Sequence, residues 1–157
     1  MRLELTRRAD YAVRAMLELA RADAGLVSGP AIAAAASIPR RFVAQVMGDL
    51  VGAGLAEART GRSGGYRLSR PAERISILEV VEAVEGDARR RTCVLRAAPC
   101  LRDGACEVHA IFSAAQDALL DRLGAASLAS VVEPEAPVER RPARGRAISG
   151  PLDRPRR

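Results

Sequence analysis

The chain has 157 residues, of which 48% are apolar, so it can bury a core of ordinary domain size and is not disordered throughout. All 25 basic residues are arginine and the formal net charge is +6, which suits phosphate and guanine contacts, although a GC-rich genome would also favour arginine. Aromatic residues make up only 3%, which disfavours sugar binding and the stacking platforms that hold single-stranded bases.

Three short helices are predicted in the N-terminal third of the chain. The first is capped by Thr6, and its apolar residues recur at helical spacing: Val13, Met16, Leu17 and Ala20. The second begins near Ser28, with Pro30 in its first turn. After a turn at 37–39, the third helix carries another apolar stripe, formed by Val43, Val46, Met47 and Leu50.

A β-hairpin and a fourth helix follow. The segment 55–59 is a short strand and 66–68 is the returning strand, with the polar, glycine-rich loop 60–65 between them. Ser76 and Glu79 have the spacing of a capping box, so they predict the start of the fourth helix, and Gly86 predicts its end. The buried face of this helix is expected to comprise Ile77, Val80, Val81 and Val84.

A cysteine-bearing loop, 89–106, leads into a last long helix. That helix has one apolar side, made of Val108, Ile111, Phe112, Ala115, Leu119 and Leu123. Beyond it, residues 133–157 are rich in proline and arginine and poor in large apolar side chains, so we expect a flexible basic tail. Such a tail is either a solvated extension or a source of non-specific DNA affinity.

The three cysteines lie close together, at Cys93, Cys100 and Cys106, and the only histidine, His109, follows the last one by three residues. An odd number of clustered thiols argues against a disulfide framework and favours metal ligands or a redox site. Structural zinc sites usually use closely paired cysteines, whereas these gaps are wider, so an iron-sulfur cluster fits better.

Other protein classes are disfavoured by what the sequence lacks. No run approaches the roughly 18 apolar residues that cross a bilayer, and residues 1–10 do not resemble a signal peptide. We therefore expect a cytoplasmic protein with no membrane partner. A P-loop, a nucleophile elbow and an HExxH motif are also missing, so we do not expect an enzyme.

Three short helices followed by a hairpin match the order of a winged helix-turn-helix. With the apolar stripe of the third helix facing the core, Arg40, Arg41 and Gln45 lie on the opposite side near its start. Recognition helices contact bases from this end, where arginine pairs with guanine and glutamine with adenine. The hairpin would form the wing, and 59–65 at its tip offers two arginines to contact DNA, Arg59 and Arg62, and three glycines that allow close approach.

Several segments, taken in this order, resemble the Rrf2 family of bacterial transcription regulators, which includes iron-sulfur-cluster regulators and nitric-oxide sensors. The resemblance covers about residues 1–132 and rests on the segments 8–17, 38–42, 54–55, 61–68, 75–81 and 85–86 together with the three cysteines. It implies a mainly α fold: a winged helix-turn-helix with a small β-hairpin wing and a long C-terminal dimerisation helix. It also implies a homodimer bound to double-stranded DNA, in which five residues place the wing: Arg59, Arg62, Ser63, Gly64 and Gly65.

The resemblance further implies a cluster held by Cys93, Cys100 and Cys106, although the first gap is one residue longer than in several members. In one group of relatives the fourth ligand is a histidine placed like His109, and in another it is an acid of the partner subunit placed like Asp10. His109 with a 2Fe-2S cluster is favoured, and the partner's Asp10 with a 4Fe-4S cluster is the alternative.

These observations predict three segments: a DNA-binding domain (1–86), a cysteine loop with a dimerisation helix (87–132) and a flexible basic tail (133–157). The expected function is a dimeric transcription regulator whose DNA affinity is controlled by an iron-sulfur cluster that responds to redox state, nitric oxide or iron. The alternatives are a zinc-stabilised protein and a cluster-free regulator that senses redox state through its thiols.

Overall fold

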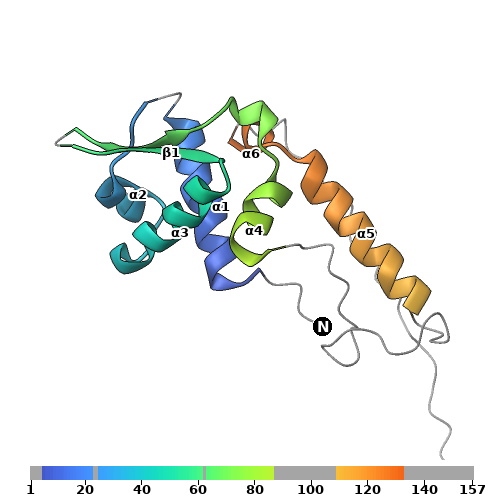
Figure 1. Ribbon diagram of the computed structural model, residues 1–157. Coiled ribbons are helices and arrows are strands. Elements are labelled where there is room, and N and C mark those ends of the chain that lie inside the picture. The colour runs from blue at the N-terminus through green and yellow to red at the C-terminus, as the bar shows by residue number, and fades with distance from the viewer. Residues whose placement is uncertain (1–4, 23–24, 62, 87–108, 133–157) are drawn as a thin grey trace, which may run out of the picture.

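The computed structural model describes residues 5–22, 25–61, 63–86 and 109–132, with the backbone alone for His109 (Figure 1). Within these residues the elements are α1 (Arg7–Arg21), α2 (Gly29–Ala35), α3 (Arg40–Gly52), β1 (Ala56–Arg59), β2 (Gly65–Leu68), a 3-10 turn η1 (Ala72–Arg74), α4 (Ile77–Glu85), α5 (His109–Ala125) and α6 (Leu128–Val132). The mainly α, winged helix-turn-helix architecture predicted from the sequence is confirmed.

The helix starts follow from the residues that precede them. Thr6, Ser28 and Ser76 each sit at an N-cap and accept a hydrogen bond from a backbone N–H of the first turn, as the sequence predicted. Between α2 and α3 the chain reverses at Ser37, whose φ of 54° lies in the left-handed region. Pro39 then opens α3 without a side-chain cap.

α1 lies at the centre of the core and packs against α2, α3, α4 and α6 (Figure 1). Its most buried face is formed by Ala9, Ala12, Ala15, Met16 and Leu19, whereas the predicted stripe residues other than Met16 are only half-buried. The periodicity therefore identified the helix, and Val13, Leu17 and Ala20 pack against the core at the edge of its most buried face. On α3 the prediction is confirmed, because all four stripe residues are buried.

The hairpin is antiparallel, with Ala56 opposite Leu68 and Arg59 opposite Gly65. The returning strand begins one residue earlier than predicted, at Gly65. Val27, in the connection between α1 and α2, adds a bridge that the sequence did not reveal. Val27 and Tyr66 exchange both backbone hydrogen bonds at 2.9 Å, so the wing is joined to the start of α2.

α4 begins with the predicted capping box. The Glu79 carboxylate accepts from the Ser76 N–H at 2.8 Å and from the Arg70 guanidinium at 2.5 Å. Partial burial alone would raise the pKa of Glu79, but the Ser76 hydrogen bonds and the Arg70 charge outweigh it and hold that pKa below its usual value. Glu79 thus joins the segment that leaves the hairpin to the first turn of α4.

We expect Glu79→Ala to lower the free energy of unfolding at neutral pH by about 1 kcal/mol, the usual cost of a lost cap. Glu79→Gln keeps the capping geometry without the charge and should cost less. Because the folded-state pKa is depressed, the charge stabilises the fold above the pKa of the unfolded chain, and this benefit is lost as the pH falls through the folded-state pKa. The free energies of unfolding of the wild type and Glu79→Gln, measured with urea, should therefore converge in acid. A difference that stays constant with pH would contradict the stabilising role of the Glu79 charge.

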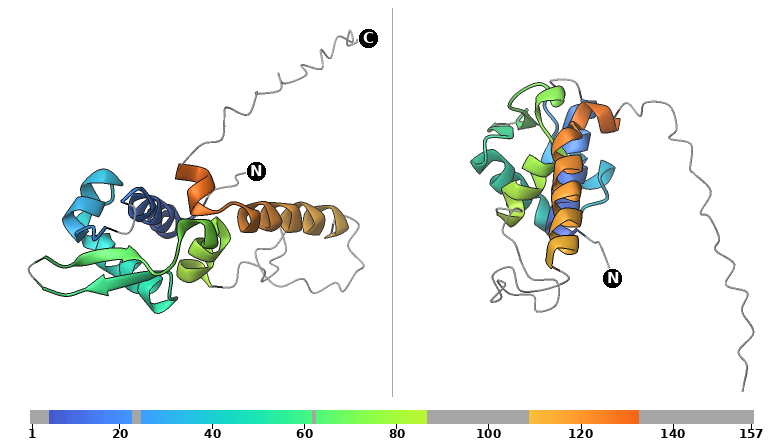
Figure 2. Two further views of the ribbon diagram at one scale, coloured as in Figure 1. Left: turned by 90° about the horizontal axis from the view of Figure 1, so that it is seen from above. Right: turned by 90° about the vertical axis from the view of Figure 1, so that its right-hand side faces the viewer.

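α5 packs on α4 only through its C-terminal half, where Leu120 is buried, and its N-terminal half projects from the body (Figure 2). The predicted apolar side is covered only in part: Leu123 packs against the core, whereas Ile111 is 69% exposed and Ala115 is exposed, as are the neighbouring Ala114 and Ala118. After Ala125 the chain turns back into α6, a helix the sequence did not predict. The cysteine loop and the tail, 133–157, lie outside the described residues.

Candidate nucleic-acid interface

The exposed face of α3 carries the residues predicted to contact bases. Arg40, Arg41 and Gln45 are exposed, and they share this face with the small residues Ala44 and Gly48. The opposite face is buried in the core. Small side chains between long polar ones allow a helix to lie deep in a major groove while the arginines and glutamine contact the base edges.

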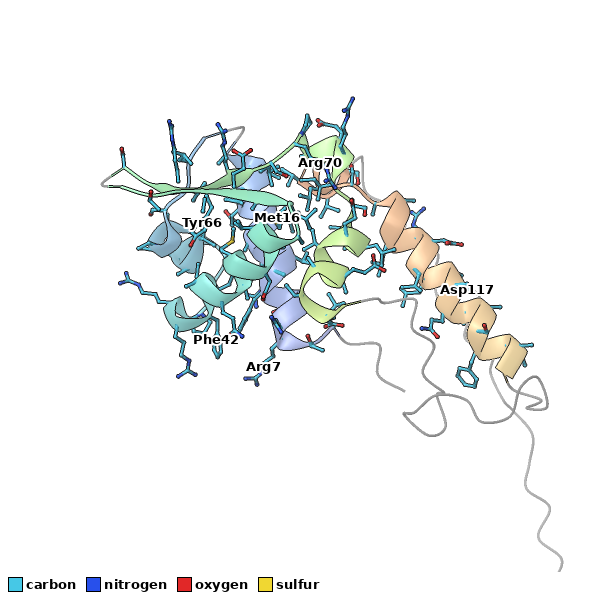
Figure 3. All side chains as sticks on the ribbon, viewed as in Figure 1. Arg7, Met16, Phe42, Tyr66, Arg70 and Asp117 are labelled. Carbon is cyan, nitrogen blue, oxygen red and sulfur yellow. The ribbon has the colours of Figure 1, made fainter. Side chains whose placement is uncertain are left out.

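A stack of side chains fixes the start of α3 against α1. The Arg41 guanidinium lies 4.9 Å from the centroid of the Phe42 ring, and that ring lies 5.6 Å from the Tyr11 ring (Figure 3 labels Phe42). Arg14 continues the stack, 5.3 Å from the Tyr11 ring. Arg14 also pairs with Asp10 and donates a hydrogen bond of 2.9 Å to the Ala36 carbonyl in the helix-turn-helix turn.

A second contact holds the C-terminal end of α3. The Arg8 guanidinium on α1 donates to the Asp49 carboxylate at 2.5 Å. Together with the aromatic stack, this ion pair connects α1 to α3 on the side that the core does not cover. The orientation of α3 is therefore fixed by α1, the same helix that carries the candidate ligand Asp10. The sequence alone did not reveal either contact.

At the wing, the predicted residues divide into two groups. Arg59 and Ser63 are exposed, and Arg62 lies outside the described residues. Gly64 and Gly65 have a structural reason to be glycine. A Cβ atom at Gly65 would meet the Val27 carbonyl oxygen at 2.6 Å, and one at Gly64 would collide with the Arg59 carbonyl oxygen. These two glycines therefore allow close packing within the wing, whether or not they also approach DNA.

We expect Gly65→Ala to destabilise the fold by about 1–3 kcal/mol, because the obstructing atoms belong to the backbone and can yield only if the wing separates from Val27. Gly48→Ala, on α3, is the matched control, because no atom lies within 4 Å of the Cβ that alanine would add there. This variant should be as stable as the wild type or more stable by up to about 1 kcal/mol. Thermal unfolding of both variants measures the difference. Equal stability of the two variants would refute the packing role.

Among the described residues, Arg40, Arg41 and Arg59 have no ion-pair partner. On the hairpin, by contrast, Arg67 pairs with Glu57 at 2.7 Å, so its charge is neutralised locally. The unpaired guanidinium groups thus include the two at the start of α3 and the one at the outer end of β1. This is the arrangement needed to contact a major groove and the backbone beside it.

The predicted metal ligands are mostly outside the described residues. Cys93, Cys100 and Cys106 fall in 87–108, while His109 is the first residue of α5. Asp10, the alternative fourth ligand, lies in the first turn of α1 and is paired with Arg14. Within the described ranges, no three histidine, cysteine, aspartate or glutamate residues come together as a metal site.

A family model described as Rrf2, an iron-dependent transcriptional regulator, matches residues 5–134. The chain belongs to the Rrf2 family. Consistently, a Neisseria meningitidis protein named as an HTH-type transcriptional regulator is 34% identical over 132 residues, covering 83% of this chain and 88% of that protein. IscR of Cereibacter sphaeroides is 38% identical over 86 residues, 53% of this chain and 56% of IscR. This Rrf2 protein is therefore a DNA-binding transcriptional regulator and not an enzyme.

Solved Rrf2-type structures confirm the fold. CymR, named as the global cysteine regulator of B. subtilis, superposes with a TM-score of 0.70 at 21% identity, covering 83% of this chain and 97% of CymR. IscR of T. potens gives a TM-score of 0.69 at 23% identity, covering 83% and 86%. In the part of the chain that the structure describes, we find no helix both long and apolar enough to span a membrane.

Proposed function

We propose that this Rrf2 regulator binds double-stranded DNA as a homodimer and that an iron-sulfur cluster in its cysteine loop controls the affinity. The observation that carries the DNA-contacting part is the exposed face of α3, where Arg40 and Arg41 are free of ion pairs. In this proposal Arg40, Arg41 and Gln45 contact bases in the major groove. Arg59, Arg62 and Ser63 contact the adjacent backbone or minor groove, and Gly64 and Gly65 shape the wing.

The projecting half of α5 supports the homodimer. Its exposed side chains include Ile111, Ala114, Ala115 and Ala118, which form an apolar strip with no cover in the described chain. Small residues let two helices approach closely, and a second α5 would remove this strip from water. A two-fold dimer places two α3 helices on one side, so the DNA site would be a pseudo-palindrome with half-sites about one helical turn apart.

The donor set supports a cluster at 93–109. Three thiolates suit iron-sulfur chemistry, and the family description as iron-dependent agrees with it. Asp10 is already engaged by Arg14, so ligation by the partner's Asp10 would require that ion pair to open. His109, at the start of α5, is therefore the preferred fourth ligand, with a 2Fe-2S cluster. When bound, such a cluster supplies chemistry that oxidant, nitric oxide or iron shortage can disturb.

The surroundings of the loop explain how its state would reach the DNA-contacting helix. Residues 87–108 connect the end of α4 to the start of α5. α4 packs on α1 and α3, and the Thr6 hydroxyl donates to the Glu85 carboxylate at 2.5 Å, tying the end of α4 to the cap of α1. α1 in turn holds α3 through the Tyr11–Phe42 stack and the Arg8–Asp49 pair. A rearrangement of the loop can therefore change the spacing of the two recognition helices.

The test is anaerobic purification followed by an absorption spectrum and assays for iron and sulfide. We expect a brown protein with bound iron, and a colourless protein after Cys93, Cys100 and Cys106 are all replaced by serine. DNA duplexes selected from a random pool by the wild type should bind the wild type and the triple variant with different affinities. His109→Ala and Asp10→Ala, compared as a pair, then identify the fourth ligand from the spectrum. Iron-free wild type with unchanged DNA affinity in the triple variant would end the cluster proposal.

A thiol-redox regulator without a cluster is the second candidate, because one solved neighbour is titled an oxidised form of Staphylococcus aureus CymR. In that case the thiol count of this chain would fall by two on oxidation, with no bound metal. A zinc-stabilised protein would be colourless and would contain zinc. Metal analysis together with a thiol count separates these outcomes from the cluster.

A further inference from the structure

The first half of α1 carries three arginines, and two of them are engaged within the fold. Arg8 pairs with Asp49 of α3 at 2.5 Å, and Arg14 pairs with Asp10. Arg7, by contrast, is exposed and has no ion-pair partner among the described residues. Its guanidinium group is therefore available to an anion outside the chain.

Arg7 lies on the side of α1 that faces the start of α3. It precedes Tyr11 by about one helical turn, so the two side chains are neighbours, about 6 Å apart along the helix axis. The Tyr11 ring lies 5.6 Å from the Phe42 ring of α3, and the Arg41 guanidinium lies 4.9 Å from that Phe42 ring. In Figure 3, Arg7 and Phe42 lie at the same edge of the molecule, with the Arg7 side chain directed away from the body. The contact between α1 and α3 thus has an unpaired arginine beside it on each helix.

The stability of the fold does not explain an arginine at position 7. Arg7 is the first residue of α1, where the partial positive charge of the helix dipole disfavours a cation. The contacts that hold α1 against α3 and the turn before it are made by other side chains, those of Arg8, Tyr11 and Arg14. Replacing Arg7 by glutamine should therefore leave the melting temperature unchanged or slightly raised.

The position of α1 beside α3 suggests which anion Arg7 would meet. A helix in a major groove has a sugar–phosphate strand along each of its two sides, and phosphate contacts fix its register there. In Figure 1 the hairpin lies above α3 and the first turn of α1 lies below it, and both elements contact α3. Arg59 of the hairpin can serve the strand on the upper side. On the other side, Arg7 is the one arginine of α1 that no acid of the described chain neutralises.

We propose that Arg7 binds a phosphate of the DNA strand that runs along the α1 side of α3, and so positions α3 in the major groove without selecting bases. Guanidinium and phosphate form charge-assisted hydrogen bonds, and each neutralised phosphate releases counterions. This inference rests on the proposed DNA-binding function and adds to it a backbone contact made by neither α3 nor the wing. A homodimer would make the contact twice, once in each half-site.

The test compares the wild type with Arg7→Gln on two duplexes, one selected from a random pool by the wild type and one of mixed sequence. Association constants are measured between about 50 and 200 mM salt. We expect the slope of log K against log salt to become shallower by about 0.9 per subunit, or about 2 for the homodimer. Affinity should fall by the same factor for both duplexes, roughly 3- to 10-fold, with base preference unchanged. Arg7→Lys should keep most of the affinity, because a phosphate accepts from a point charge as well.

A second measurement locates the phosphate. Single phosphates of the selected duplex are replaced, one position at a time, by uncharged methylphosphonates. One position in each half-site should weaken binding of the wild type and leave binding of Arg7→Gln unchanged, because the variant has already lost that contact. If every replacement affected the wild type and Arg7→Gln equally, Arg7 would contact no phosphate and the proposal would be overturned.

Arg74→Gln is the matched control, because the Arg74 side chain is also exposed and unpaired among the described residues but belongs to η1, which packs on α6. It should keep the wild-type slope. A slope of Arg7→Gln equal to that of the wild type would overturn the proposal. A clearly lowered melting temperature or a loss of base preference would do so too, since Arg7 would then act on the fold or on bases. If the wild type selected no duplex, the proposed regulator function would fail, while the mixed-sequence duplex would still test Arg7.

Discussion

Replacing Arg41 by alanine is expected to weaken binding to the selected duplex by about 1–3 kcal/mol, roughly 5- to 150-fold, and to relax base preference at one position of each half-site. Arg41 is exposed near the start of α3, and its stacking on Phe42 orients the guanidinium before DNA arrives. A pre-oriented side chain loses little rotamer entropy on binding. Titrations against the selected duplex and its single-base substitutions measure both effects.

Arg41→Lys is the matched control, because it keeps the charge but loses the planar pair of donors. It should retain most of the affinity for mixed-sequence DNA and still lose base preference. Were Arg41→Ala to lower the affinity for every sequence by the same factor, Arg41 would be a phosphate contact only. The base-contacting role would then fall to Arg40 and Gln45, which share the exposed face of α3.

The parts of the fold that local chemistry determines were predictable. α1 and α4 begin at the predicted caps Thr6 and Ser76, whose hydroxyls each accept from an otherwise free backbone N–H. α3 was predicted with its correct buried face because it packs on one side only. The exposed positions of Arg40, Arg41 and Gln45 then follow, because these residues lie away from the four buried apolar ones.

The parts that depend on distant contacts were not predictable. α1 is surrounded by α2, α3, α4 and α6, so alanines such as Ala12 are buried as fully as the large residues, and the spacing of the large residues does not reveal this. The bridge from Val27 to Tyr66 joins segments that carry no mutual signal in sequence. The sequence therefore suggested that Gly65 lets the wing approach DNA, whereas in the structure a Cβ atom at Gly65 would collide with the backbone of Val27. The cysteine ligands stay a prediction from spacing and family resemblance.

Replacing Ile111 by glutamate is expected to convert the homodimer into a monomer and to weaken binding to the selected duplex by about 100-fold or more. Ile111 is 69% exposed in the single chain, so the glutamate carboxylate would stay hydrated in a monomer and the fold should keep its stability. In the proposed dimer the same carboxylate would be buried without a partner, at a cost of about 3–5 kcal/mol. Sedimentation or light scattering gives the oligomeric state, and a DNA titration gives the affinity.

Leu26→Glu is the control, because Leu26 is also a large apolar residue that is exposed in the single chain, at 37%. It lies between α1 and α2, far along the chain from α5. It should leave the dimer intact. If Ile111→Glu remained dimeric, the two-fold axis would lie elsewhere, and the half-site spacing argued from α5 would no longer hold. If it became monomeric but kept full affinity, one α3 helix and one wing would suffice for binding, and the pseudo-palindromic site would lose its physical basis.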